Sequence, residues 1–178
     1  LTRRADAEYA AAVLAAWASR YIGRENAEGA RPPKAAHGEV IVSETGEGRY
    51  TNAIAAGTHV LRADEPESVG GLDSGFSPYE LVSAGLGACT SMTLRMYAER
   101  KQWPLKKVTV RLTHGKVHAA DCAECETREG KIDRFSRQIT LEGDLDTEQR
   151  QRLLKIADRC PVHRTLHSET SVTTELVE

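Results

Sequence analysis

The chain has 178 residues, which is enough for one well-buried domain. Its 24 Lys and Arg residues nearly balance 26 Asp and Glu residues, and the formal net charge of -2 provides no basic field to attract nucleic acid or anionic lipid. No apolar stretch approaches the roughly 20 residues of a membrane-spanning helix, and no signal peptide is visible, so we expect a cytoplasmic protein. Four cysteines in that setting are more typical of reactive or metal-binding thiols than of a disulfide framework.

The N-terminal segment, residues 5–23, has a period-four apolar stripe that predicts an amphipathic helix ending at Gly23. Its stripe consists of Tyr9, Val13, Trp17 and Tyr21. The next residues, 24–38, are polar and broken by glycine and proline, which is typical of a linker. We therefore expect a boundary near residue 36, with a helix and linker in residues 1–36 and the main domain in residues 37–178.

Short β-rich stretches follow at residues 39–44, 48–57 and 58–64, separated by glycine-bearing turns. This pattern predicts a three-stranded meander. The glycine-rich residues 65–76 then lead to a helix with a clear start signal. Ser77 and Glu80 have the spacing of a capping box around Pro78, a residue that suits the first helical turn.

The helix predicted from Pro78 to about Lys101 carries several small residues, Ala84, Gly87 and Ala88, that let another backbone approach closely. We expect a buried central helix, one face of which carries Gly85, Cys89, Met92, Thr93 and Met96.

Two half-buried strands are predicted where apolar and polar residues alternate, at 107–114 and 134–143, and we expect them to pair. A helix follows at 147–159, with Leu153, Ile156, Ala157 and Cys160 on one face, and a last strand is predicted at 170–177. Segregated strands with two long helices indicate an α+β fold.

Two cysteines stand out by their surroundings. Cys89 lies three turns inside its predicted helix, where burial by itself raises a thiol pKa, so a small core cysteine is the alternative to a reactive one. Cys160 ends a helix just before Pro161. Exposed amide groups there, with His163 and Arg164, favour a thiolate, whereas the alternative is a simple helix-ending residue.

The other two cysteines form a C-x-x-C at Cys122 and Cys125, downstream of His114 and His118. This is at most half of a zinc site, and it does not open a helix after a strand as a redox motif does, so solvated loop cysteines are favoured. A hydrolase built on Cys89 or Ser91 with His163 or His167 stays open, although no nucleophile elbow or cysteine-protease signature surrounds either nucleophile.

Two motifs in order, "SPYELVSAGLGACTSM" and "CPVHRTL" followed by a closing strand, make residues 37–177 resemble the OsmC/Ohr family of osmotically inducible and organic-hydroperoxide-resistance proteins. The resemblance implies an OsmC-like α+β fold with antiparallel sheets, two central helices and an intertwined homodimer with sites at the subunit interface. It further implies that Cys89 is the peroxidatic thiol and Cys160 the resolving thiol. The substrate would be an organic hydroperoxide and the reductant an external dithiol, with no metal or organic cofactor.

The resemblance also implies an Arg from a turn near the first strands and a Glu shortly before the first cysteine. Arg49 in "GEGRYT" is the nearest candidate for the cation. Ten residues before Cys89 this chain has Tyr79, and the adjacent Glu80 is our candidate acid, turned by about 100° on the helix.

The C-x-x-C insert and the opening helix resemble a branch in which this domain follows an α/β-hydrolase domain, which would also account for Leu1 in place of Met. Two functions are therefore expected. The first is a thiol-dependent peroxidase in oxidative-stress defence, favoured by the intact cysteine pair. The second is a non-enzymatic domain that binds a small apolar ligand or serves a hydrolase partner, favoured by Tyr79.

Overall fold

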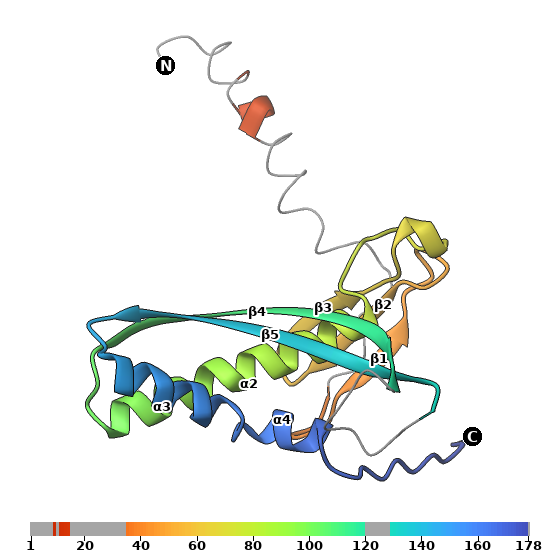
Figure 1. Cartoon of the computed structure of the whole chain (residues 1–178). Helices are drawn as coiled ribbons and strands as arrows, with labels where there is room; N and C mark the ends of the chain where they lie inside the picture. Colours follow the sequence, from red (N-terminus) through yellow and green to blue (C-terminus); the bar gives the residue numbers. More distant parts are fainter. Residues whose placement is uncertain (1–8, 10, 15–34, 120–128, 178) are drawn as a thin grey trace. The chain divides into compact units, whose positions relative to one another are not determined.

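The computed structural model describes Tyr9 and residues 11–14, 35–119 and 129–177 (Figure 1). The chain divides into two compact units, Leu1–Phe76 and Ser77–Glu178. Tyr9 and residues 11–14 are helical, in agreement with the predicted N-terminal helix, most of which lies outside the described residues. The boundary expected near residue 36 stays a prediction.

The first unit contains the predicted meander. Strands β1 (Ile41–Glu44), β2 (Asn52–Ala56) and β3 (His59–Ala63) pair antiparallel in the order β1-β2-β3. A two-residue turn joins β2 to β3, and its Gly57 has φ 59°, a conformation that side chains with a Cβ rarely adopt. The sequence prediction of three short antiparallel strands is therefore confirmed.

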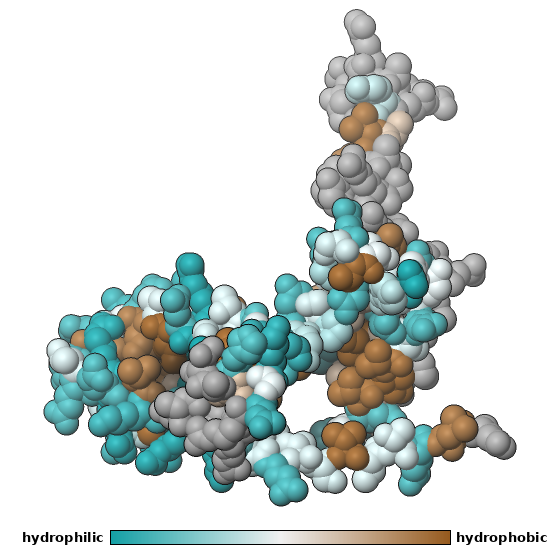
Figure 2. Space-filling model, turned by 45° about the vertical axis from the view of Figure 1, so that its right-hand side comes forward, coloured by the Kyte–Doolittle hydropathy of each residue, from teal (hydrophilic) through white to brown (hydrophobic). Residues whose placement is uncertain are grey.

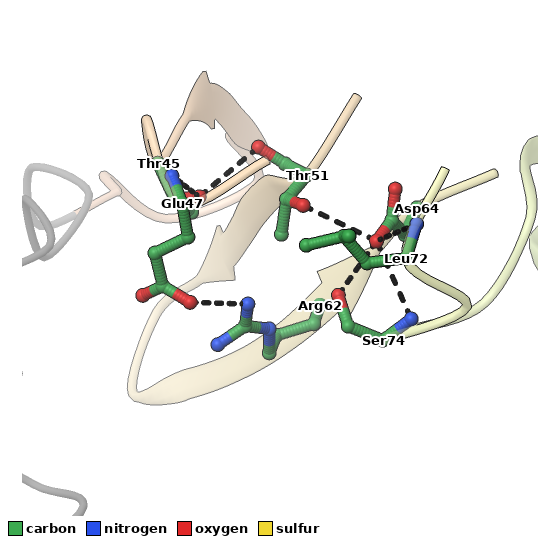
Figure 3. Close-up of polar contacts among 7 residues, drawn as sticks. All are labelled: Thr45, Glu47, Thr51, Arg62, Asp64, Leu72 and Ser74. Carbon is green, nitrogen blue, oxygen red and sulfur yellow. Dashed lines mark hydrogen bonds and ion pairs between the residues drawn. The ribbon is translucent and has the colours of Figure 1, made fainter. Parts of the chain in front are cut away.

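A buried carboxylate, Asp64, organises the loop that follows β3 (Figure 3). Its Oδ2 accepts hydrogen bonds from Ser74 Oγ at 2.7 Å, Thr51 Oγ1 at 3.2 Å, and the backbone amides of Leu72 and Ser74. The Oδ1 atom accepts from the Glu65 amide at 2.9 Å. This loop, which includes a 3-10 turn η2 (Glu67–Val69), is thus held to the sheet by one side chain.

The second unit consists of one long hairpin and three helices. Helix α2 (Pro78–Arg100) is followed by β4 (Leu105–His118) and β5 (Lys131–Gly143), which pair antiparallel. Helices α3 (Thr147–Ala157) and α4 (Pro161–Leu166) complete it. In Figure 1, α2 and α3 lie on the same face of the hairpin, which confirms the α+β class with antiparallel sheets.

The core of this unit lies between the hairpin and the two long helices. It contains Leu94, Tyr97, Ala98, Leu105, Leu145, Leu153, Ile156 and Ala157. Strand alternation places Val108, Ile139 and Leu141 against it. Within the described ranges, no helix is long and apolar enough to cross a bilayer.

The buried face of α2 differs from our expectation. The face with Gly85, Met92 and Met96 is exposed, and the two methionines are 64% and 69% accessible. The stripe that packs against β4 and α3 instead includes Leu86, Thr90 and Leu94, spaced four residues apart. Larger branched side chains filled the core, and the flexible methionines were left outside.

The predicted last strand is wrong. Residues 170–177 have no strand structure, and their apolar side chains Val172, Leu176 and Val177 are exposed. Figure 2 shows brown patches along this C-terminal segment. A β-rich composition does not make a strand unless a neighbouring strand supplies backbone partners.

Candidate functional site

Cys160 lies where α3 ends and α4 begins. It is the N-cap residue of α4, directly before Pro161, and its side chain is fully buried. The backbone amide of His163 donates a hydrogen bond of 3.3 Å to Cys160 Sγ. A side chain that accepts from the third helical amide is the usual N-cap geometry, here made by sulfur.

The second thiol contacts the first. Cys89 is half-buried on α2, and its thiol donates a hydrogen bond to Cys160, while Thr90 Oγ1 donates another of 3.7 Å. Both thiols are free. Sequence analysis selected Cys89 and Cys160, and the fold brings them together.

The electrostatics favour ionisation at Cys160. Burial raises the pKa of its thiol, but hydrogen bonds from His163, Thr90 and Cys89 and the charge of Arg137 outweigh burial, so the pKa lies below 9.0, the ordinary value. The prediction of an activated thiol at Cys160 therefore agrees with the contacts, through the backbone amide of His163.

Arg137 supplies a cation that sequence analysis missed. It lies on β5 opposite Leu112, and its side chain is 12% exposed. Its Nη1 donates to Thr90 Oγ1 at 2.8 Å and to the Ala157 carbonyl at 3.2 Å, while Nη2 donates to Asp158 Oδ1 at 2.7 Å. The guanidinium thus joins α2, β5 and the end of α3.

A signal for these two residues was present in the sequence. Arg137 interrupts the alternating row Phe135, Ile139 and Leu141, at a position where an inward-facing residue is expected. Thr90 lies between Leu86 and Leu94 in the i, i+4 stripe of α2 and is also fully buried. A polar residue at a core position is informative because it requires a partner.

The imidazole of His163 is held neutral rather than charged. Burial lowers its pKa, and the nearby His167 and Arg137 lower it further, although Asp158 opposes them. The ring centroids of His163 and His167 are 4.4 Å apart. The imidazole therefore adds little positive charge beside Cys160 at neutral pH.

Glu80 caps α2, as the sequence indicated. Its Oε2 accepts from the Ser77 amide at 2.8 Å and from Ser77 Oγ at 2.9 Å. These bonds lower the pKa of the carboxyl, and burial opposes them slightly. Glu80 and Cys89 are nine residues apart on one helix, about 13 Å along its axis, so one chain does not bring them into contact.

Tyr79 stacks on His114, with ring centroids 4.0 Å apart and planes at 9°. His114 Nε2 in turn contacts Asp133 Oδ1 at 2.8 Å. This hydrogen bond is the largest influence on the pKa of Asp133, which lies below its ordinary value. The position where the resemblance implies an acid thus belongs to an aromatic and imidazole cluster.

Arg49 lies in the first unit, where its guanidinium is 5.1 Å from the ring centroid of Tyr50. Its expected role toward Cys89 stays a prediction. Cys122 and Cys125 lie outside the described residues. Among the described residues, no three His, Cys, Asp or Glu side chains are grouped as metal ligands would be.

Three solved structures share this fold. A Psychrobacter arcticus protein matches with a TM-score of 0.56 and 21% identity, covering 75% of this chain and 90% of its own. An OsmC-like protein from Mycoplasma pneumoniae has a TM-score of 0.54 and 17% identity, with coverages of 72% and 84%. A Legionella pneumophila protein described as an organic hydroperoxide resistance protein OsmC has a TM-score of 0.53 and 20% identity, with coverages of 74% and 90%.

No curated protein matches this chain. The family model described as OsmC-like protein matches residues 71–175, which include both cysteine motifs and most of the second unit. The matched region is more than half of the sequence. This chain therefore belongs to the OsmC-like protein family.

Proposed function

We propose that this protein is a thiol-dependent peroxidase that reduces organic hydroperoxides through Cys89 and Cys160. One observation carries the proposal: two free cysteines from distant parts of the sequence lie in hydrogen-bonding contact. Membership of the OsmC-like family supports it, as does the description of the Legionella pneumophila protein as an organic hydroperoxide resistance protein.

The proposed reaction starts at Cys89 because its sulfur is half-buried whereas Cys160 is fully buried. The Cys89 thiolate attacks the outer peroxide oxygen, an S–O bond forms, the O–O bond breaks, and the alkoxide takes a proton and leaves as the alcohol. Cys160 then attacks the Cys89 sulfenic acid and releases water. The resulting disulfide is reduced by an external dithiol.

The site is proposed to be completed by a second copy of the chain, in the cytoplasm. Support for a homodimer comes from the exposed apolar face of α2, which includes Val82, Met92 and Met96. Arg49 and Glu80 are proposed to form its polar network. Residues 1–36 are proposed to be a helix and linker outside the OsmC-like domain of residues 37–178.

The test adds one equivalent of an organic hydroperoxide to reduced protein and maps the oxidised peptides by mass. The background variant Cys122→Ser, Cys125→Ser removes the two other thiols. We expect a rapid Cys89–Cys160 disulfide in this background. Cys160→Ser should stop at a sulfenic acid on Cys89, which a dimedone adduct would reveal, and Cys89→Ser should leave peroxide unconsumed.

Persistent peroxide with both thiols reduced would refute the peroxidase proposal. The same variants would then serve to examine the alternative function, a domain that binds a small apolar ligand or assists a hydrolase partner.

A further inference from the structure

Arg137 is a cation on the apolar face of a hairpin. Burying a guanidinium costs free energy unless its donors are satisfied. Two of its partners, the Ala157 carbonyl and Asp158, are at the C-terminal end of α3, where a basic side chain anchors a helix. The third partner, Thr90, has no part in that anchoring, because it lies on α2.

The hydrogen bonds through Thr90 have a fixed direction. A guanidinium can only donate, so the Thr90 hydroxyl must accept from Arg137 and keeps its single O–H for another acceptor. That acceptor is Cys160 Sγ. The chain of donors therefore runs from Arg137 through Thr90 to the sulfur, and each bond polarises the next.

Three donors converge on this buried sulfur: the Thr90 hydroxyl, the His163 amide and the Cys89 thiol. Donors that point at a group stabilise its charged form when that form is an anion. The geometry makes Cys160 the acceptor and Cys89 the donor within the pair. A neutral Cys160 would leave part of this set of donors poorly used.

We propose that Arg137 and Thr90 are positioning residues that keep Cys160 the ionised thiol of the pair, so that Cys160 closes the disulfide and leaves when it is reopened. This inference rests on the proposed peroxidase function. In closure, the Cys160 thiolate attacks the Cys89 sulfenic sulfur, an S–S bond forms, the S–O bond breaks, and hydroxide takes a proton to become water.

Reopening uses the same property. A thiolate of the external dithiol attacks the more accessible Cys89 sulfur, the S–S bond breaks, and Cys160 departs with the electron pair. The second thiol of the reductant then closes its own disulfide and frees Cys89, so the reductant is oxidised as the protein disulfide is reduced. A thiolate that is stable at neutral pH is the better leaving group.

The first measurement needs no peroxide. Ultraviolet absorbance of the thiolate is titrated with pH in the Cys122→Ser, Cys125→Ser background, with and without Cys160→Ser, so that the difference reports Cys160. We expect Arg137→Met and Thr90→Val to move the Cys160 midpoint upward by about one pH unit. Arg137→Lys and Thr90→Ser should recover part of that shift.

Asp158→Asn is the matched control, because it breaks the ion pair at the end of α3 but leaves the contact between Arg137 and Thr90. It should not raise the midpoint. The second measurement forms the disulfide with diamide and follows its reduction by dithiothreitol. Arg137→Met and Thr90→Val should slow this step on the order of threefold, because the leaving thiol is less acidic.

An unchanged midpoint in Thr90→Val and Arg137→Met would overturn the inference and leave Arg137 as an anchor for α3. If Arg137→Met does not fold, Arg137→Lys and the Thr90 variants decide the matter. Failure of the peroxidase proposal is distinguishable, because there the titration would be normal in the background variant while peroxide oxidised neither thiol.

Discussion

Thr90 on α2 and Cys160 at the start of α4 are joined by a hydrogen bond of 3.7 Å, although 70 residues separate them in the chain. Both side chains are fully buried. The same hydroxyl accepts from Arg137 on β5, so the site depends on the packing of α2, α4 and the hairpin. Helix packing and thiol chemistry are therefore coupled, and the predictions below address the parts of the fold that support this coupling.

Truncation of Leu153 is expected to destabilise the second unit. Its side chain is fully buried in the core between α2 and α3, and Leu→Ala changes at such sites cost about 2 to 5 kcal/mol of unfolding free energy. The control is Leu154→Ala, because the neighbouring side chain is 53% exposed. Urea unfolding should show a large loss for Leu153→Ala and a small one for Leu154→Ala. Equal losses would contradict the packing described.

Gly143 at the end of β5 is expected to tolerate no side chain. It has φ 139°, and a Cβ there would overlap the carbonyl oxygen of Pro104 and lie 2.9 Å from the Lys106 amide nitrogen. Gly143→Ala should cost more than about 1 kcal/mol in thermal or urea unfolding. Gly115→Ala in β4 is the control, since a Cβ there meets nothing within 4 Å. A harmless Gly143→Ala would show that this end of the hairpin is arranged differently.

Asp64→Asn is expected to destabilise the first unit in a pH-dependent way. The side-chain hydrogen bond from Ser74 lowers the pKa of Asp64; burial opposes it, but backbone bonds and Thr51 add to it, so the pKa stays below 3.8. Because the folded pKa is the lower one, the stabilisation is fully present above the ordinary pKa and is lost as pH falls through the folded pKa.

The urea midpoints of wild type and Asp64→Asn should therefore differ most at neutral pH and converge in acid. Asp73→Asn, an exposed change in the same loop at φ 50°, where asparagine is tolerated, is the control and should follow wild type. A difference between wild type and Asp64→Asn that persists at the lowest pH would show that the charge of Asp64 is not its source.

Met92→Glu is expected to weaken self-association if the proposed homodimer uses the exposed face of α2. A carboxylate at the centre of an apolar interface costs desolvation free energy, so the dimer dissociation constant should rise at least tenfold. Sedimentation analysis measures this. Gln151→Glu adds the same charge at an exposed position of α3 and should leave association unchanged. An unaltered dimer in Met92→Glu would exclude this face as the interface.

Local sequence patterns were sufficient for much of the fold. Alternation predicted the hairpin strands, the meander and its glycine turns were recognised, and Ser77 and Glu80 marked the start of α2. These features depend on residues a few positions apart, so the sequence carries them directly. The two cysteine motifs likewise identified Cys89 and Cys160 as a pair without any structure.

What only the tertiary structure decided was the environment of that pair. The sequence did not reveal that Met92 faces outward and Thr90 inward, that residues 170–177 lack a strand neighbour, or that Arg137 reaches across from β5. Each of these depends on which surfaces meet when helices pack on the hairpin. The stability of a thiolate at Cys160 depends in the same way on donors from α2 and a charge from β5, which meet only in the folded chain.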